Sequence, residues 1–163
     1  MKKSTILLLV VVYIVSFFII GLLGQAIRGY NEQIYPTSIV LEDPDNKTIV
    51  TTDVKDESTG ELLFDYNFVY RNYTNGANFR IKATVKPENS TWPNVSFTKD
   101  GDNLSFDIQT HEDNSAVEKN FALITLNDSV DETNPYLSAT FFVISDNPGT
   151  KIKLHVCVTF VAY

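Results

Sequence analysis

The sequence predicts an all-β protein, an antiparallel β-sandwich of about 7–9 strands preceded by one N-terminal transmembrane helix. Three observations support this class. An uncharged apolar run opens the chain, the rest alternates apolar and polar residues with the period of a strand, and turn-forming residues separate the alternating segments. About 130 residues follow the apolar run, which is enough for one domain and too few for two.

The apolar run extends from Ile6 to Leu23 without a charge, and uncharged residues continue it to Ile27, before Arg28. A helix over residues 6–27 would be about 33 Å long, enough to cross the hydrocarbon core of a bilayer. We therefore expect a transmembrane anchor, or uncleaved signal, at 6–27. The alternative is a signal peptide cleaved after Ala26, because the preceding Gly-Gln-Ala has the small-x-small pattern of a cleavage site.

The charges beside the apolar run predict the orientation of the chain. Lys2 and Lys3 precede the run without an acidic neighbour, and basic flanks stay in the cytoplasm. We expect residues 1–5 in the cytoplasm, 28–36 as a tether and 37–163 as an extracytoplasmic domain. The predicted location is the cell membrane, with a single pass.

The clearest strand pattern is Phe79–Lys86, in which apolar residues alternate with Arg, Lys and Thr. Pro and Gly fall between such segments rather than inside them, as expected for turns. His111–Lys119 has no strand pattern and is expected to be a loop or a single helical turn. The predicted strands are Ser38–Leu41, Thr48–Thr51, Phe64–Tyr70, Phe79–Lys86, Val95–Thr98, Leu104–Gln109, Phe121–Leu126, Leu137–Val143 and Ile152–Phe160.

Several segments resemble the bacterial Ig-like domains of the group 2 type. Ala83–Thr91 resembles that family's Ala-Thr-Val-x-Pro-x-Asn-Ala-Thr motif, and Phe97 stands where the family usually has Trp. Thr37–Leu41 and Gly149–Leu154 resemble its first strand and its late Gly-Thr stretch. Over residues 37–161 the resemblance implies an Ig-like sandwich at a cell surface. The chain departs from the family in a long insert, Glu42–Glu61, and in lacking its Gly-rich hairpin.

The charge and cysteine content exclude several classes of protein. The net charge is −7, and every acidic residue lies at Glu32 or later, so the folded part is strongly acidic. Nucleic-acid binding needs a basic surface, and we expect none here. The single cysteine, Cys157, excludes an intramolecular disulfide and a Cys-based zinc site.

Two histidines and this cysteine are the candidates for catalysis. His111 lies in a polar loop, and His155 lies two residues from Cys157 on one predicted strand, so both side chains share a face. A Cys–His pair can act as nucleophile and base. No motif surrounds any of the three residues, and we therefore expect no enzyme and no catalytic residue.

Acidic turns are the candidates for metal binding. Two turns offer the oxygen ligands that calcium prefers, but without EF-hand spacing. Their residues are Asp43, Asp45, Asp100, Asp102 and Asn103. The alternative is turn capping, in which Asp and Asn bond their own backbone. The same two alternatives apply to a third cluster, formed by Asp128, Asp131 and Glu132. Calcium is the only cofactor considered.

The chain also carries candidate modification and binding residues. Asn-x-Ser/Thr sequons are more frequent than composition predicts, and most lie at predicted turns or strand ends where a glycan fits. They begin at Asn46, Asn72, Asn89, Asn94, Asn103 and Asn127. Aromatic side chains are candidates for a carbohydrate- or protein-binding face; these are Tyr66, Tyr70, Tyr73, Trp92 and Tyr136.

From these observations we expect a membrane-anchored extracytoplasmic Ig-like module with a structural or binding role at the cell envelope. Its partner would be an unknown envelope protein or a cell-wall component. Two alternatives remain open. The first is a subunit of an envelope machine, such as an archaeal stator-type protein that contacts a surface layer, which the excess of sequons favours. The second is a calcium-dependent binding protein, or an enzyme, that uses the acidic turns.

Overall fold

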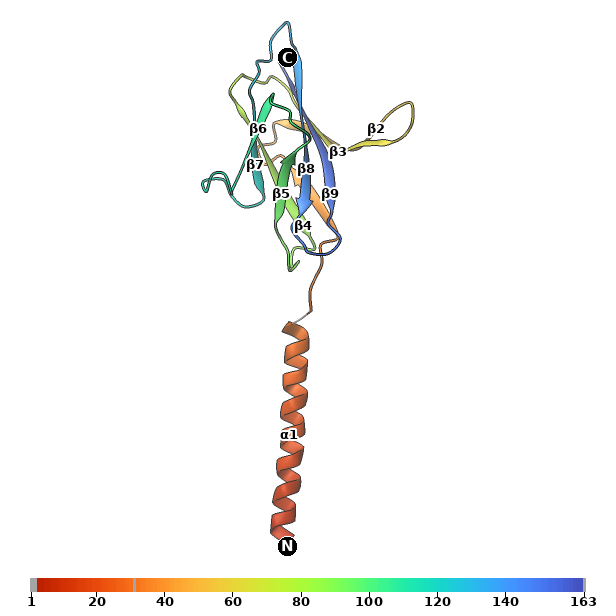
Figure 1. Cartoon of the computed structure of the whole chain (residues 1–163), viewed down its shortest axis with the longest axis vertical. Helices are drawn as coiled ribbons and strands as arrows, with labels where there is room; N and C mark the ends of the chain where they lie inside the picture. The colour runs from red at the N-terminus through yellow and green to blue at the C-terminus, as the bar shows by residue number, and fades with distance from the viewer. Residues whose placement is uncertain (1–2, 31, 163) are drawn as a thin grey trace. The chain divides into compact units, whose positions relative to one another are not determined.

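The computed structural model describes residues 3–30 and 32–162, and the chain divides into two compact units, Met1–Gln33 and Ile34–Tyr163 (Figure 1). The first unit contains helix α1, Lys3–Tyr30. Its segment Ser4–Gly24 is long and apolar enough to cross a membrane. Parts of three predicted segments lie outside the described residues, namely Met1 and Lys2 of the cytoplasmic segment, Asn31 of the tether and Tyr163 of the domain.

Helix α1 extends a few residues beyond both ends of the predicted 6–27 span. Ser16, inside the apolar segment Ser4–Gly24, is compatible with a lipid environment. Ser16 donates its hydroxyl to the carbonyl oxygen of Val12 at 2.8 Å, so this group is satisfied within the helix itself.

The second unit consists of nine strands within the described residues, as the sequence predicts. The strands are β1 (Ser38–Glu42), β2 (Thr48–Lys55), β3 (Leu62–Tyr70), β4 (Asn78–Lys86), β5 (Val95–Lys99), β6 (Phe106–Thr110), β7 (Phe121–Leu126), β8 (Tyr136–Ser145) and β9 (Lys153–Val161). The segment His111–Lys119 between β6 and β7 forms turns.

The strands form two sheets, a four-stranded sheet of order β1-β4-β7-β6 and a five-stranded sheet of order β2-β3-β9-β8-β5. Neighbours are antiparallel except β3 and β9, which are parallel. This confirms the all-β sandwich class with one N-terminal helix. The four-stranded order β1-β4-β7-β6 matches the order of strands A, B, E and D in one sheet of a constant-type immunoglobulin sandwich. The order β9-β8-β5 matches that of strands G, F and C in its other sheet. The relation to the bacterial family stays a prediction.

Alternation of side chains places the core between the sheets. β4 buries every second residue from Phe79 to Val85, while the residues between them are more exposed. Phe79 meets Phe68 and Phe160 of the other sheet, with ring centroids 5.5 and 6.3 Å apart. Each fully buried Phe contributes about 1.5–3 kcal/mol, so these rings are a main reason why the two sheets stay together.

The end of the predicted tether packs on the sandwich. The N–H of Ile34 donates to Oγ1 of Thr91 at 2.9 Å, and the Ile34 carbonyl accepts the Thr91 N–H at 2.9 Å. Tyr35 packs its ring on Trp92, with centroids 4.9 Å apart. The chain is therefore fixed to the sandwich from Ile34 on, and Ile34–Pro36 belong to the folded unit.

The region expected as an insert, Glu42–Glu61, contains strand structure. β2 continues four residues past the predicted end at Thr51, to Lys55. Its second half, Thr52–Lys55, is mainly polar and exposed, so no apolar pattern marks it in the sequence. The insert therefore extends the five-stranded sheet, and β2 includes the predicted strand Thr48–Thr51.

Candidate functional site

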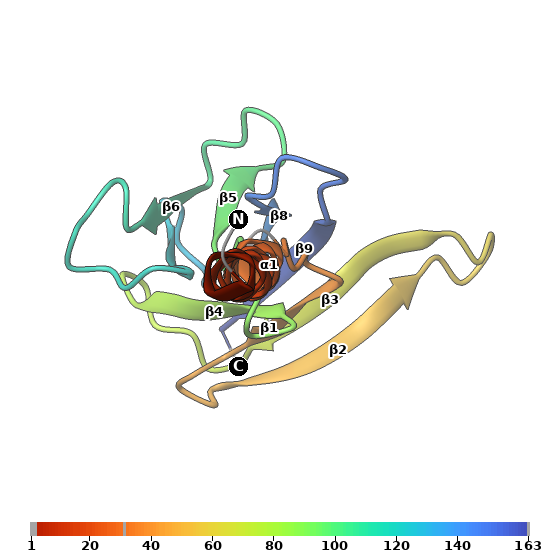
Figure 2. The ribbon, with the colours of Figure 1, turned by 90° about the horizontal axis from the view of Figure 1, so that it is seen from below.

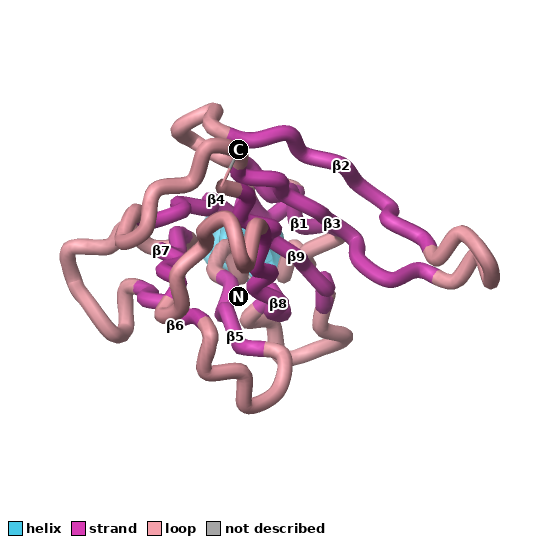
Figure 3. Tube along the Cα trace, turned by 90° about the horizontal axis from the view of Figure 1, so that it is seen from above, coloured by secondary structure: helices cyan, strands magenta, loops and turns pink. Residues whose placement is uncertain are grey.

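The most distinctive feature of the sandwich is a protruding hairpin, here called the arm, made of residues 53–65. β3 pairs with β9 only from Tyr66 to Tyr70, so Leu62–Asp65 pair with β2 alone. Figures 2 and 3 show β2 and the start of β3 running out together beyond the rest of the sandwich. A two-stranded ribbon is only marginally stable by itself in water, so the arm lacks the support that a third strand gives.

β2 is the edge strand of the five-stranded sheet, and β3 is its only partner within residues 32–162. Its far side therefore presents unpaired N–H and C=O groups. Residues 48–52 read Thr-Ile-Val-Thr-Thr, all β-branched and uncharged, and Ile49 and Val50 are 56% and 40% exposed. Natural edge strands are usually protected by Lys, Pro or a bulge, because an unprotected edge pairs with other strands. This half of β2 carries no such protection until Asp53, which has a φ of 54°.

The tip of the arm is ordered and acidic. Asp56 Oδ1 accepts the N–H groups of Ser58 at 2.7 Å and Thr59 at 2.9 Å, together with the Ser58 hydroxyl. These hydrogen bonds, led by that hydroxyl, lower the pKa of Asp56 to about 2. Residues 53–61 contain four acidic residues and one lysine. An unprotected strand edge thus leads directly into a negatively charged turn.

A second cluster lies on the outer face of the same sheet, around His155. The imidazole lies between the rings of Phe64 and Phe142, each with its centroid 4.6 Å away. Its Nε2–H donates to Asp100 Oδ2 at 2.9 Å, and its backbone N–H donates to Asp65 Oδ2 at 2.7 Å. His155 therefore joins β3, β8 and β9 and holds the base of the arm.

The structure does not assemble the catalytic candidates. Cys157 is buried, and this burial raises the pKa of its thiol, which disfavours the thiolate that a nucleophile needs. Its sulfur lies 3.7 Å from the hydroxyl of Thr159, while the His155 ring bonds Asp100. His111 Nδ1–H donates to the Val117 carbonyl at 2.6 Å and supports the loop that carries it.

The first acidic turn shows the capping geometry that was the alternative to calcium. Asp43 Oδ1 accepts the N–H of Asp45 at 2.9 Å. Its Oδ2 accepts the N–H of Lys47 at 2.7 Å and the hydroxyl of Thr48 at 2.8 Å. Asp45 lies within 3.8 Å of Lys47 and 3.5 Å of Arg80. Both carboxylates thus have partners from the chain itself.

The second acidic turn is similar. Asp100 bonds His155, and Asn103 Oδ1 accepts the N–H of Ser105 at 2.9 Å, while Asp102 is exposed. In the third cluster, Asp131 Oδ1 accepts N–H groups of the turn that follows it. No group of three His, Cys, Asp or Glu side chains suited to a metal occurs in the described part of the chain. The calcium site stays a prediction without a formed ligand set.

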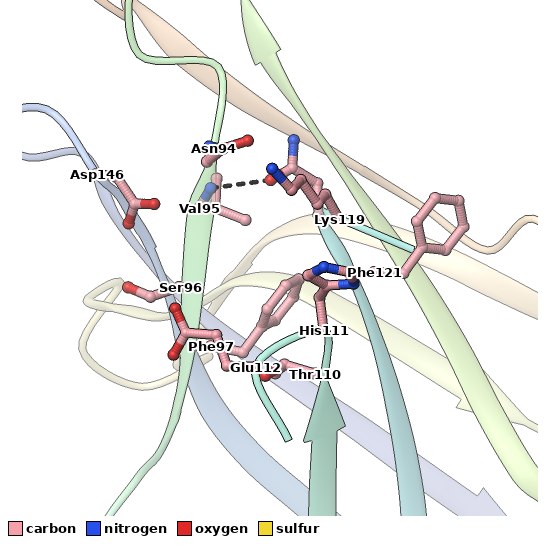
Figure 4. A pocket seen from close by; sticks show the side chains of 11 residues that line it. Asn94, Val95, Ser96, Phe97, Thr110, His111, Glu112, Lys119, Phe121 and Asp146 are labelled. Carbon is pink, nitrogen blue, oxygen red and sulfur yellow. Dashed lines mark hydrogen bonds between the residues drawn. The ribbon is translucent and has the colours of Figure 1, made fainter. Parts of the chain in front are cut away.

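A pocket of about 220 Å³ lies between β5, the turn after β6 and the start of β7 (Figure 4). Phe97 contributes apolar surface, and the polar groups come from His111, Glu112, Lys119 and Asp146. Sequence reasoning did not group these residues, because they come from strands that are far apart in the chain.

The sequons divide into two groups. Four of their asparagines are exposed and make no side-chain hydrogen bond with the described residues: Asn46, Asn72, Asn89 and Asn94. The other two are engaged. Asn127 Nδ2 donates to the Leu104 carbonyl at 2.9 Å, and Asn103 accepts a backbone hydrogen bond. Glycosylation stays a prediction for all six.

The aromatic candidates do not form one surface. Tyr73 is buried and packs edge-on against Phe160, while Tyr66 and Tyr70 pack against the core. Trp92 packs on Tyr35, and only Tyr136 is largely exposed, at 65%.

The exposed edge of β2 was missed from the sequence, although its run of uncharged β-branched residues is visible there. The run alone does not show which strand lies at an edge, since that depends on the order of strands in the sheet.

Comparison of the chain with family models, with curated proteins and with solved structures gives no match.

Proposed function

We propose that this chain is a membrane-anchored, extracytoplasmic binding module without catalytic activity, and that it binds its partner by strand addition at the edge of β2. The proposed partner is another envelope protein that offers an extended segment. The observation that carries the proposal is the uncharged, β-branched and exposed edge at residues 48–52. Main-chain hydrogen bonds would supply affinity, and the side chains along the edge would supply specificity.

The charge of the arm indicates the chemistry of the segment. Residues 53–61 carry a net charge of −3, from four acidic residues and Lys55. We infer that the bound strand has an uncharged, β-branched centre and Lys or Arg at the end that meets the tip. Complementary charges of this kind raise the association rate and weaken as salt screens them.

The location supports the same function. Helix α1 has the length and apolarity of a membrane span, and Lys2 and Lys3 favour a cytoplasmic N-terminus. We infer that the sandwich lies outside the membrane, where its strand order supports the resemblance to Ig-like surface domains. The alternative, a subunit of an envelope machine, differs only in the lifetime of the complex. In that case one partner protein would provide the added strand permanently.

The test is affinity purification of the full-length tagged chain from detergent-solubilised membranes of the source organism. We compare the wild type with Ile49→Lys, which places a charge on the edge. The matched control is Thr98→Lys, on exposed β5 at the opposite edge of the same sheet.

We expect one partner protein with the wild type and with Thr98→Lys. With Ile49→Lys we expect about tenfold less partner or lower, because the charge must be desolvated in the new strand pair, and each loss of about 1.4 kcal/mol raises the Kd tenfold. Equal urea midpoints for the three chains show that folding is unchanged. Recovery of the same partner with Ile49→Lys would contradict the proposed edge. Recovery of cell-wall material alone would contradict the proposed protein partner.

A further inference from the structure

We propose that Asn94 is N-glycosylated and that the first sugar attached to it lies in the pocket beside it, between β5 and the β6–β7 connection. The inference concerns a site on the opposite edge of the five-stranded sheet from β2. It is independent of the proposed strand addition.

The environment of Asn94 combines a fixed backbone with a free carboxamide. Its carbonyl accepts the N–H of Asp146 at 3.1 Å. On either side, the Asn120 side chain accepts the N–H of Val95 at 3.0 Å and donates to the Pro93 carbonyl at 2.8 Å. The side chain of Asn94 itself is exposed and makes no hydrogen bond with the described residues. The residue is therefore held in place while its Nδ2 remains accessible.

The sequence at this position meets the requirement for N-glycosylation. Asn94, Val95 and Ser96 form an Asn-x-Ser sequon without proline at the middle position, and Ser96 is exposed. The sugar donor would be a lipid-linked oligosaccharide phosphate. Nδ2 forms a bond to the anomeric carbon, the bond from that carbon to the phosphate oxygen breaks, and the amide loses one proton. The lipid phosphate leaves with the electron pair, so no oxidant or reductant is needed.

The pocket suits a single sugar residue. Asn94 belongs to its lining, and Figure 4 shows the Asn94 side chain at one end with Lys119 across from it. Its volume, about 220 Å³, is below the range for drug-sized ligands, which favours one ring over a longer chain. Phe97 offers an apolar surface to the C–H face of a sugar, and Glu112 and Asp146 offer acceptors to its hydroxyl groups.

The other sequons lack this combination. Asn127 would lose the hydrogen bonds from its Nδ2 to the Leu104 carbonyl and to Asp107 Oδ2, at 2.9 and 3.2 Å. Asn89 is exposed and lies in the same β4–β5 connection as Asn94, but it does not line the pocket. Asn89 is therefore the matched control: it has a sequon but no pocket beside it.

The first measurement is mass spectrometry of peptides from the full-length chain, purified from membranes of the source organism. We expect the peptide that contains Asn94 to carry a sugar mass, and Asn94→Gln to abolish it. A peptide found only without added mass would overturn the proposal.

The second measurement tests the place of the sugar by thermal unfolding of the same full-length preparations. We expect Asn94→Gln to lower the Tm by about 2–4 °C, the shift that a lost hydrogen bond or two produces in a chain of this size. We expect Asn89→Gln to leave the Tm unchanged. Equal Tm values for wild type and Asn94→Gln would overturn the placement in the pocket. In chains made in a bacterial host without N-glycosylation, wild type and Asn94→Gln must have the same Tm. A difference there would also overturn the placement of the sugar in the pocket, because the lost carboxamide, rather than a lost sugar, would then explain the change in Tm.

Discussion

His155 on β9 and Asp100, which directly follows β5, are joined by a hydrogen bond from Nε2 to Oδ2 of 2.9 Å across the outer face of the five-stranded sheet. β8 lies between these two strands, so the bond spans it. The same ring fills the space between Phe64 and Phe142. The cluster fixes the base of the arm to the sandwich.

The first prediction concerns this cluster. His155→Ala removes two ring contacts, worth about 0.5–1.5 kcal/mol each, and one partly exposed hydrogen bond. We expect a loss of about 1–3 kcal/mol in the free energy of unfolding, measured in urea. His155→Phe keeps the ring contacts and is the control, with a loss of about 1 kcal/mol or less. Equal losses for both variants would show that ring packing does not matter here.

The second prediction concerns pH and the tip of the arm. The folded-state pKa of Asp56 is lowered from 3.8 to about 2 by hydrogen bonds, chiefly from the Ser58 hydroxyl. A lowered pKa stabilises the fold above pH 3.8, and this contribution is lost as the pH falls through 2. Wild type should therefore be more stable than Asp56→Asn at pH 7, and the difference should shrink between pH 4 and pH 2. A difference that does not change with pH would exclude the carboxylate as its cause.

The third prediction concerns Cys157. Burial raises the pKa of its thiol, and the thiolate is the reactive form. We expect reaction with a thiol reagent at pH 8 to be slower in the folded chain than in urea, because the buried thiol forms less thiolate and is shielded from the reagent. Cys157→Ser provides the blank. Equal rates in both states would restore the cysteine as a candidate nucleophile.

The fourth prediction concerns calcium. The Asp43 carboxylate accepts three hydrogen bonds from its own turn, and Asp100 bonds His155. Calcium prefers six to eight oxygen ligands, and binding here would require these bonds to break. We expect millimolar calcium to leave the Tm unchanged, with equal magnesium as the control for ionic strength. A rise of several degrees with calcium alone would support the calcium-dependent alternative.

The sequence predicts the strands that have one buried face. β4, β7 and β8 alternate buried and partly exposed residues, and their apolar positions are visible in the chain. The second half of β2 was missed because its residues Thr-Asp-Val-Lys are mainly polar and lack the apolar pair, Ile49 and Val50, that marks the first half. The start of β6 falls at Phe106 rather than Leu104, which is 83% exposed although it fits the apolar pattern.

The candidate sites were harder to predict than the strands. The unprotected edge depends on β2 being outermost, and the pocket joins β5 to the β6–β7 connection across the open side of the sandwich. Both features depend on strand order, to which local sequence contributes little. The pairing of His155 with Asp100, 55 residues apart, has no signal in a single sequence either.

The central claim is that the edge of β2 binds a strand of another envelope protein. The most direct measurement is photo-crosslinking in cells from a benzophenone amino acid placed at Ile49, with Thr98 as the control position on β5. The proposal predicts one dominant product from position 49, containing a second envelope protein, and none from position 98. No product from position 49, equal products from both positions, or a product containing only two copies of this chain would contradict the claim.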